Sequence, residues 1–305
     1  MKDIYHKYNI FYLILGLLII LSICLGIFIY INRGCNVHRD MVAFLNIGQG
    51  DAIYIENKLG QSILIDTGNT DSGVLQQIRN VKTCHKVTIQ TLILTHADQD
   101  HIGEAANLIQ KGYVGKVIHN GFLDMDQLKE NQSENNLEKI IKIKSIPTQD
   151  MVKNPTFDFK NFNVTFLYPT TTPYMDKKGK SKNVDDNDYS IVLKLNHSNF
   201  SFMLMGDAPI KAEKEIINHN CGKNATSTCP VLESNVLKLG HHGSKNSSGI
   251  DFLKKVNAED YIVSAGLNNK YNHPNEETIY RVYLNKKNSH VRETFSEGNI
   301  VYILE

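Results

Sequence analysis

The chain has 305 residues, enough for one large α/β domain or two small ones. Hydrophobic residues make up 41% of it and charged residues 21%, which are the proportions of a globular protein and exclude a largely disordered chain. A net charge of +1 excludes a general electrostatic attraction to nucleic acid, so a polyanion would have to be bound by a local group of residues.

Residues 10–31 form an uncharged segment of 22 residues, IFYLILGLLIILSICLGIFIYI. At about 1.5 Å per residue, a helix of this length spans the roughly 30 Å hydrocarbon core of a bilayer. We expect a single-pass anchor in the cell membrane that contacts lipid, with a short polar N-terminus at 1–9 and a polar tether at 32–40. A signal sequence is the alternative, although no cleavage site of small residues closes the segment.

The cysteines indicate the side of the membrane on which the domain at 41–305 lies. The positive-inside rule is uninformative here, because two basic residues flank the anchor on either side. Four cysteines outside the anchor include one close pair, which suits an oxidising exterior. We expect disulfides between Cys221 and Cys229 and between Cys35 and Cys84, with free thiols as the alternative. The domain is therefore expected to be extracytoplasmic.

The first half of this domain predicts strands followed by alternating strands and helices. The expected strands are at 41–47, 52–55, 62–65, 87–94 and 114–119, with helices at 73–81 and 103–111. A weak helix is expected at 124–131. The pattern at 134–160 is irregular, with short strands near 141–146 and 150–153.

The second half predicts a similar order of elements. Strands are expected at 162–168, 189–195, 200–205, 235–239, 261–264, 291–295 and 299–304, with helices at 209–220, 248–256 and 274–284. A polar loop at 170–188 carries a basic run at 177–182 that is a candidate phosphate contact, with a plain exposed loop as the alternative. Two mixed sheets packed face to face, with helices outside, are the expected four-layer α/β arrangement.

The turn after the strand at 87–94 carries four groups that can bind a metal ion within six residues: His96, Asp98, Asp100 and His101. A turn can aim alternate side chains at one point, which a regular strand or helix cannot do. Two imidazoles and two carboxylates suit a divalent ion such as zinc or manganese. A polar loop that happens to be rich in Asp and His is the alternative.

Other expected strands end in residues of the same kind. Asp207 follows the apolar run 202–205, and a carboxylate there is costly to bury unless it is paired or metal-bound. The adjacent residues His241 and His242 follow the strand at 235–239. Asp66 follows the strand at 62–65 and is placed to orient a neighbouring ligand, or simply to close a turn. Since strand ends on one edge of a fold meet in a cleft, we expect these residues near the 95–103 turn.

Four segments resemble the metallo-β-lactamase-fold domain of the ComEC-type DNA-uptake proteins. They are FLNIGQGDA at 44–52, THADQDHIG at 95–103, LMGD at 204–207 and LKLGHHGS at 237–244. The resemblance covers about residues 41–305. It implies a metallo-β-lactamase-like αββα sandwich with a cleft for one or two divalent metal ions.

The resemblance also implies a set of ligands. His96 and Asp98 would hold the first metal, Asp100, His101 and His242 the second, and Asp207 would bridge the two. The superfamily's third histidine for the first metal should fall near Tyr189, where this sequence has none. This indicates either that the first metal is absent or that it is bound weakly by oxygen, which favours manganese, with Asn187, Asp188 or Ser190 standing in through water.

The sequence therefore predicts a membrane-anchored metallohydrolase that acts on phosphodiesters, with nucleic acid such as single-stranded DNA as the leading substrate. Asp100 is the expected water-orienting base, and His241 the expected proton donor or substrate contact. Further candidate substrate contacts are Ser244, His273, Asn187 and Ser190. His273 can equally be a helix-capping residue. The alternatives are a smaller phosphoester such as cell-wall phosphocholine, a lactam or thioester, or a non-catalytic binding module. Protein partners are not indicated.

Overall fold

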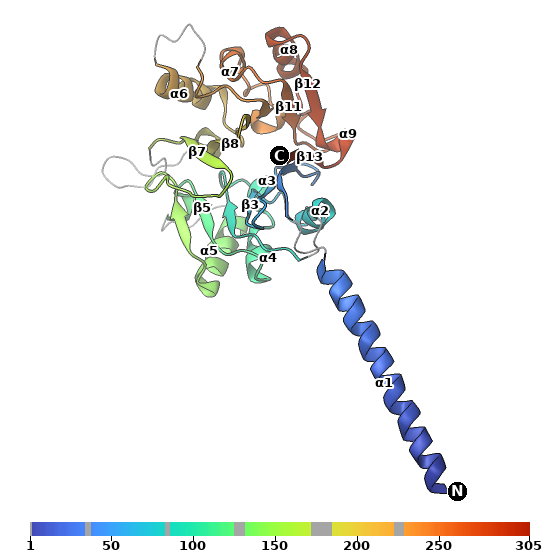
Figure 1. The fold of residues 1–305 in the computed structure, drawn as a ribbon. Coiled ribbons are helices and arrows are strands. Elements are labelled where there is room, and N and C mark those ends of the chain that lie inside the picture. The colour runs from blue at the N-terminus through green and yellow to red at the C-terminus, as the bar shows by residue number, and fades with distance from the viewer. Residues whose placement is uncertain (1, 34–37, 83–85, 125–131, 172–184, 223–228) are drawn as a thin grey trace.

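The computed structural model describes residues 2–33, 38–82, 86–124, 132–171, 185–222 and 229–305, with the backbone alone for 2–11 and 28–33. Helix α1 (Lys2–Arg33) extends away from the globular part of the chain (Figure 1). The large apolar side chains described on α1, from Tyr12 to Ile27, are all exposed. Among the described residues, no helix is both long enough and apolar enough to cross a membrane.

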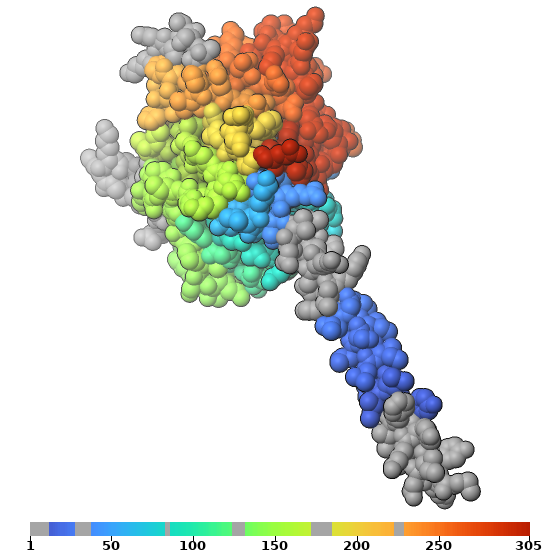
Figure 2. Space-filling view, in the orientation of Figure 1, coloured from blue at the N-terminus to red at the C-terminus, as the bar shows by residue number. Residues whose placement is uncertain are grey.

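The first sheet has seven strands in the order β13-β1-β2-β3-β4-β5-β6. They are β13 (Ile300–Leu304), β1 (Asp40–Phe44), β2 (Ile53–Glu56), β3 (Ser62–Ile65), β4 (Thr91–Ile93), β5 (Val117–His119) and β6 (Thr148–Asp150). The pairs from β13 to β3 are antiparallel and those from β3 to β6 are parallel. The last strand of the chain thus pairs with the first, which places the dark red C-terminus against blue residues in Figure 2.

The second sheet has six strands in the order β12-β11-β10-β9-β8-β7. They are β12 (His290–Glu293), β11 (Asp260–Val263), β10 (Val236–Lys238), β9 (Phe200–Leu204), β8 (Val192–His197) and β7 (Asn163–Tyr168). The β7–β8 and β8–β9 pairs are antiparallel, and the pairs from β9 to β12 are parallel. Parallel strands end at the same edge of a sheet, so the loops after β9 and β10 emerge side by side.

The two sheets pack against each other through alternate side chains of their strands. Val42 and Phe44 of β1 lie in one apolar cluster with Phe202 of β9, while Met41 and Ala43 point to the opposite face. On that face, helices α2 (Val74–Val81), α3 (Gln99–Ile102), α4 (Ala105–Gln110) and α5 (Gln132–Lys144) cover the first sheet. Helices α6 (Ile210–Cys221), α7 (Ile250–Val256) and α8 (Glu276–Asn285) cover the second. The four-layer arrangement expected from the sequence is therefore present.

Several predicted boundaries were wrong. Residues 132–144 form α5, where we expected irregular chain and a strand at 141–146. The β-branched run Ile140, Ile141 and Ile143 suggested a strand, but Leu137 and Ile141 lie four residues apart and pack on the first-sheet cluster as one helix face. The expected strand at 150–153 occurs earlier, at Thr148–Asp150.

The chain between β7 and β8, and the chain after β12, also differ from expectation. A short 3₁₀ turn, η3 (Asp186–Tyr189), precedes β8, which therefore starts three residues later than predicted. Helix α9 (Thr294–Glu297) replaces the end of the strand expected at 291–295. The expected helix at 124–131 lies outside the described residues except for Asp124, which ends the 3₁₀ turn η2 (Phe122–Asp124). The basic run at 177–182 also lies outside them.

One of the two expected disulfides is confirmed. Cys221, the last residue of α6, is bonded to Cys229, with Cα atoms 5.6 Å apart. Cys35 and Cys84 lie outside the described residues, so their pairing remains a prediction.

Candidate metal centre

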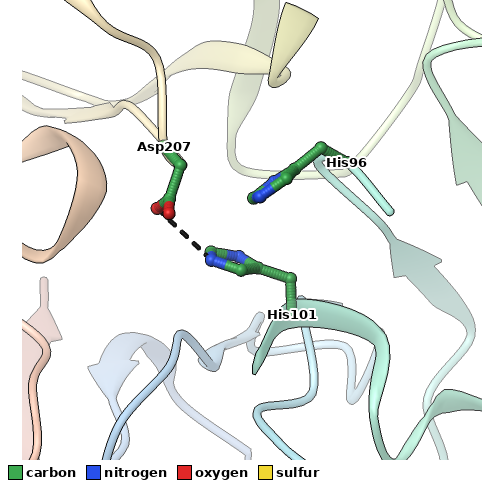
Figure 3. A group of neighbouring side chains, drawn as sticks. All are labelled: His96, His101 and Asp207. Carbon is green, nitrogen blue, oxygen red and sulfur yellow. Dashed lines mark ion pairs between the residues drawn. The ribbon is translucent and has the colours of Figure 1, made fainter. Parts of the chain in front are cut away.

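Four strand ends from the two sheets meet at one edge of the sandwich. Asp66 follows β3 and the 95–103 turn follows β4 in the first sheet, whereas Asp207 follows β9 and His241 and His242 follow β10 in the second. Figure 3 shows His96, His101 and Asp207 pointing toward one another, with Asp207 facing the two histidines from the opposite sheet. The sequence prediction that these strand ends share a cleft agrees with this placement.

The ring nitrogens and carboxylate oxygens in this group are close enough to share one ion. His101 Nε2 lies 3.3 Å from Asp207 Oδ1, and His242 Nε2 lies 3.5 Å from Asp207 Oδ2. The His96 and His101 ring centroids are 4.1 Å apart. The sets His96–His101–Asp207 and Asp100–His101–His242 each present ligand atoms within 4.8 Å of one another.

The buried atoms of this group fit a bound cation. His96, His101, His242 and Asp207 are each at most 2% exposed. The four atoms that point into the group have no hydrogen-bond partner: His96 Nε2, His101 Nε2, His242 Nε2 and Asp207 Oδ1. Leaving several converging polar atoms buried and unpaired is expensive, and a metal ion satisfies all of them at once. The residues present therefore suit a divalent metal.

The opposite nitrogen of each histidine is held by a partner that fixes the tautomer. Asp66 Oδ2 lies 2.8 Å from His101 Nδ1, and Thr95 Oγ1 lies 2.9 Å from His96 Nδ1. The Nδ1 of His242 donates to the Ser264 carbonyl at 2.8 Å. With Nδ1 as the donor, Nε2 carries the lone pair that a metal needs.

Mutual attraction controls the charge of the buried groups. Burial opposes the charge on His242, but Asp207 and Asp51 outweigh it and raise its pKa to about 10. Burial likewise opposes the charge on His101, but Asp207 and Asp66 raise its pKa well above the ordinary value. Burial alone would raise the pKa of Asp207, yet His242 and His101 hold it well below its usual range. Protons thus occupy in the metal-free protein the positions that a cation would take.

The two other carboxylates of the turn lie on the more open side of the group. The Asp98 side chain is 42% exposed, and its Oδ2 lies 3.5 Å from His96 Nε2. The Asp100 side chain is 22% exposed, and its Oδ2 lies 3.4 Å from His242 Nε2. Both acids can therefore reach an ion held by the histidines while remaining accessible to water.

The position without the expected histidine is occupied by η3. Asn187 Nδ2 lies 3.5 Å from Asp98 Oδ2, and Asn187 Oδ1 is buried without a hydrogen-bond partner. Ser190 is completely buried, and its Oγ accepts from the Asp207 backbone N–H at 3.0 Å and lies 3.4 Å from His96 Nδ1. Asn187 is thus beside the candidate ligands His96 and Asp98, whereas the Ser190 hydroxyl lies behind His96 and holds the Asp207 backbone.

The histidine pair after β10 has a strained backbone. His241 and His242 have φ values of 48° and 55°, and this left-handed conformation sends the two rings in different directions. The His242 ring is buried, whereas the His241 side chain is 32% exposed with its Nε2 3.6 Å from Asp207 Oδ2. Burial lowers the pKa of His241, so the ring is neutral at pH 7 and can accept a proton. His273 is adjacent, with its ring centroid 5.5 Å from that of His241. Ser244 is almost fully buried.

Sequence reasoning missed a buried ion pair beside His242. Asp51 Oδ1 lies 3.3 Å from His242 Nδ1, and Asp51 Oδ2 lies 3.0 Å from Nζ of Lys238, which is fully buried on β10. The turn that carries Asp51 packs closely against the 95–103 turn at Gly50. A Cβ at this position would lie 2.3 Å from the Asp100 carbonyl oxygen, so only glycine allows this approach. In the sequence, the Gly-Gln-Gly-Asp turn stands out only as part of the segment at 44–52. The one available signal was a lysine in the otherwise apolar β10.

Comparison with known proteins agrees with this geometry. The Metallo-beta-lactamase superfamily pattern matches residues 45–266, well over half of the chain. The chain belongs to this superfamily. Among solved structures, the metallo-beta-lactamase fold protein YhfI of Bacillus subtilis matches with a TM-score of 0.52 at 12% identity, covering 87% of this chain and 99% of that one. The metal-dependent hydrolase Tm1679 gives 0.51 at 12% identity, covering 87% and 99%. At such identities the likeness concerns the fold alone.

Relatives by sequence include competence-related proteins, as the resemblance predicted. ComE operon protein 3 of Bacillus subtilis is 29% identical over 92% of this chain and 35% of its own length. Competence protein ComA of Neisseria gonorrhoeae is 24% identical over 87% of this chain and 36% of its own. This chain thus spans about a third of either relative. It is a superfamily member of the metal-dependent hydrolase type, related to competence proteins, with His/Asp clusters suited to divalent metals.

Proposed function

We propose that this chain is a metal-dependent phosphodiesterase that acts on nucleic acid outside the cytoplasm, in DNA uptake or in the processing of extracellular nucleic acid. Residues 10–31 anchor it in the cell membrane. Single-stranded DNA is the leading substrate, and one or two zinc or manganese ions are the cofactors.

The observation that carries this proposal is the convergence of four buried ligand atoms that make no hydrogen bond, beside two partly exposed carboxylates. A site built only to stabilise the fold would satisfy these atoms with hydrogen bonds and bury the acids as well. A decayed, non-catalytic site would not keep partners on the Nδ1 atoms of all three histidines. The arrangement therefore supports catalysis over a plain binding module.

When bound, divalent ions at such a centre lower the pKa of water and stabilise charge on phosphoryl oxygens. His101, His242 and Asp207 would hold one ion together with Asp100, and His96, Asp98 and Asp207 the other. Asp100, with its partly exposed carboxylate, can orient water toward the phosphorus atom. His241 is neutral and half-buried on the exposed side of the group. It can take up a proton and then donate it to the leaving oxygen.

The environment of Asp98 supports manganese at the first position. Asp98 is itself an oxygen ligand, and Asn187, whose Nδ2 lies 3.5 Å from Asp98 Oδ2, adds a buried amide oxygen that has no hydrogen-bond partner. Oxygen-rich sites favour harder ions over zinc. The second position, with two histidines, suits either metal.

The exposed apolar side chains of α1 support the membrane anchor. Such a continuous exposed apolar surface, as on α1, usually marks a site that contacts a membrane or another protein. The confirmed Cys221–Cys229 disulfide supports an oxidising compartment for the domain, since such bonds are rare in the cytosol.

The proposal is tested on the full chain purified in detergent. Metal content is measured first, and then turnover of bis-p-nitrophenyl phosphate with added manganese. We expect turnover in the intact protein and its loss in His101→Ala, whereas His290→Ala, which changes a side chain that is 73% exposed on β12, should leave it unchanged. Unchanged turnover in His101→Ala would refute the metal-hydrolase function, and phosphocholine release without DNA cleavage would refute nucleic acid as the substrate.

A further inference from the structure

The loop between β11 and α8 forms a cavity beside the candidate metal centre. The cavity has a volume of about 600 Å³, within the range of about 300–1,000 Å³ that small-molecule sites occupy. Its lining is mostly polar and includes Asn268, Asn272, His273, Glu276 and Glu277. The His273 ring also lies against the His241 ring of the candidate metal centre, with centroids 5.5 Å apart, so the cavity adjoins the centre.

Aromatic rings lead from the buried centre to the solvent along this loop. The His242 and His273 centroids are 6.5 Å apart with planes 30° from parallel, and those of His273 and Tyr271 are 5.9 Å apart at 20°. Tyr271 is 51% exposed. Lys270 Nζ lies over the Tyr271 ring, 4.9 Å from its centroid, and places a positive charge on the same loop.

The loop is held in place before any ligand binds. The Asn269 side chain accepts from the backbone N–H groups of Tyr271 and His273, at 3.1 and 3.0 Å. The Gly266 N–H donates to Gln49 Oε1 at 3.2 Å, and the Asn275 N–H donates to the Gly243 carbonyl at 2.9 Å. The loop is thus tied to the turn that carries Asp51 and to the turn that carries His242. This preorganisation lowers the entropic cost of binding.

The charges around the cavity indicate what it accepts. Glu276 and Glu277 repel a phosphate inside it, whereas Asn268 and Asn272 offer amide donors and acceptors to an uncharged polar ring. Lys270 favours a phosphate at the edge of the loop, and it disfavours a quaternary ammonium on the Tyr271 ring. A planar, uncharged, hydrogen-bonding group next to a phosphate matches a nucleotide.

We propose that the loop at 268–275 is a nucleobase subsite, in which the base beside the phosphate at the metal centre stacks on the Tyr271–His273 rings and hydrogen-bonds to the cavity amides. This subsite rests on the proposed phosphodiesterase function. It would give the enzyme a preference for nucleic acid over other phosphodiesters, without sequence specificity, because every base has a face that can stack.

The test compares three esters with the same p-nitrophenolate leaving group, using the full chain in detergent with manganese. They are thymidine 5′-(p-nitrophenyl phosphate), methyl p-nitrophenyl phosphate and p-nitrophenylphosphocholine. Stacking of one base predicts that kcat/KM for the thymidine ester exceeds that for the methyl ester by about 5- to 150-fold. Tyr271→Ala should remove most of this preference by lowering kcat/KM for the thymidine ester, while Tyr271→Phe should keep it. Tyr283→Ala, at a half-exposed tyrosine further along α8, is the matched control.

Each other outcome overturns the subsite in a distinct way. Equal kcat/KM for the thymidine and methyl esters in the unmodified protein would eliminate the subsite while leaving the phosphodiesterase intact. A preference for phosphocholine that Tyr271→Ala removes would make the loop a cation site. If no ester is cleaved, the proposed function fails, and fluorescence anisotropy in EDTA decides the subsite separately. Equal binding of an oligothymidylate and its abasic analogue would then overturn it.

Discussion

The Asp66 carboxylate sets the orientation of two candidate ligands through one oxygen. Its Oδ2 lies 2.8 Å from His101 Nδ1 and also accepts the Thr95 hydroxyl at 2.8 Å. Since the Thr95 hydroxyl donates to Asp66, its oxygen is free to accept from His96 Nδ1, which lies 2.9 Å away. A buried carboxylate outside the metal-binding group therefore fixes both His96 and His101 with Nε2 directed at the centre.

Asp66→Asn should lower metal affinity by about 10- to 100-fold, because it removes this support without removing a ligand. The amide nitrogen is a donor, so His101 Nδ1 would have to become an acceptor and its Nε2 would carry the proton. Titration with manganese or zinc, followed by calorimetry, measures the loss. Asp158→Asn, at a side chain that is 78% exposed, should bind metal normally. Equal affinity in the two variants would mean that Asp66 only closes a turn.

The Asp51–Lys238 pair should stabilise the fold near the centre. Burial alone would raise the pKa of Asp51, but Lys238 and His242 hold it below the ordinary value. Asp51→Ala leaves the fully buried Lys238 charge without its partner, and breaking a buried pair in this way costs about 3–5 kcal/mol.

Replacing both partners should recover most of that loss. In Asp51→Ala/Lys238→Met no buried charge is left unpaired, so urea unfolding of the double variant should lie closer to the unmodified protein than that of Asp51→Ala does. A double variant as unstable as the sum of the two single variants would show that the residues do not interact energetically.

The parts of this site that could be predicted are those that a short segment of the sequence contains on its own. The 95–103 turn and the residues after β9 and β10 stand out because polar groups follow apolar strands, and strand ends of one edge must meet. Asp51 and Lys238 could not be paired in the same way. They come from different sheets, and their contact depends on how the two sheets pack together, which no local pattern encodes.

Errors in the fold have a similar origin. Helix α5 carries a β-branched run whose local preference is for a strand, and its helical state depends on packing of Leu137 and Ile141 against the first-sheet cluster. Ser190 was expected to contact substrate or to stand in for the missing histidine, because it follows Tyr189 in sequence. The turn of η3 instead buries it behind His96, where its hydroxyl holds the Asp207 backbone.

His241→Gln should lower kcat by about 10²- to 10⁴-fold with little change in metal content, because His241 faces Asp207 at 3.6 Å from the exposed side. Glutamine can hydrogen-bond but cannot carry a proton near pH 7. The pH–rate profile of the variant should therefore lose the limb that His241 contributes. Loss of bound metal in His241→Gln would assign this ring to coordination instead.

Removing the Cys221–Cys229 disulfide should destabilise the domain by about 2–3 kcal/mol, the loop-closure estimate for a bond that joins residues separated by 8 positions. Cys221→Ala/Cys229→Ala should unfold at a lower urea concentration than the oxidised protein. Reduction of the unmodified protein should lower this concentration in the same way. Alkylation of cysteines with and without reduction, read by mass spectrometry, also tests the expected Cys35–Cys84 pair. Four cysteines that react without reduction would contradict an oxidising location.

Metal binding and pH should be linked through His101 and His242. The metal-free pKa of His242 is about 10, above the value of about 6.5 that an unfolded chain gives, and that of His101 is raised as well. A group whose pKa is raised by folding contributes stability below its unfolded pKa and loses it as the pH rises through its folded pKa. The melting temperature of the metal-free protein should therefore decrease as the pH is raised from 6.5 to 10.

Bound metal should reverse this trend, because the ion needs the neutral imidazoles and replaces their protons. At pH 7 we expect manganese or zinc binding to release protons, measured by calorimetry in buffers of different ionisation enthalpy, and affinity should rise with pH. His242→Gln, which cannot be protonated, should release fewer protons and show a flatter melting profile in EDTA. Binding without proton release at pH 7 would mean that His101 and His242 are already neutral in the metal-free protein, and that Asp207 does not hold their charge.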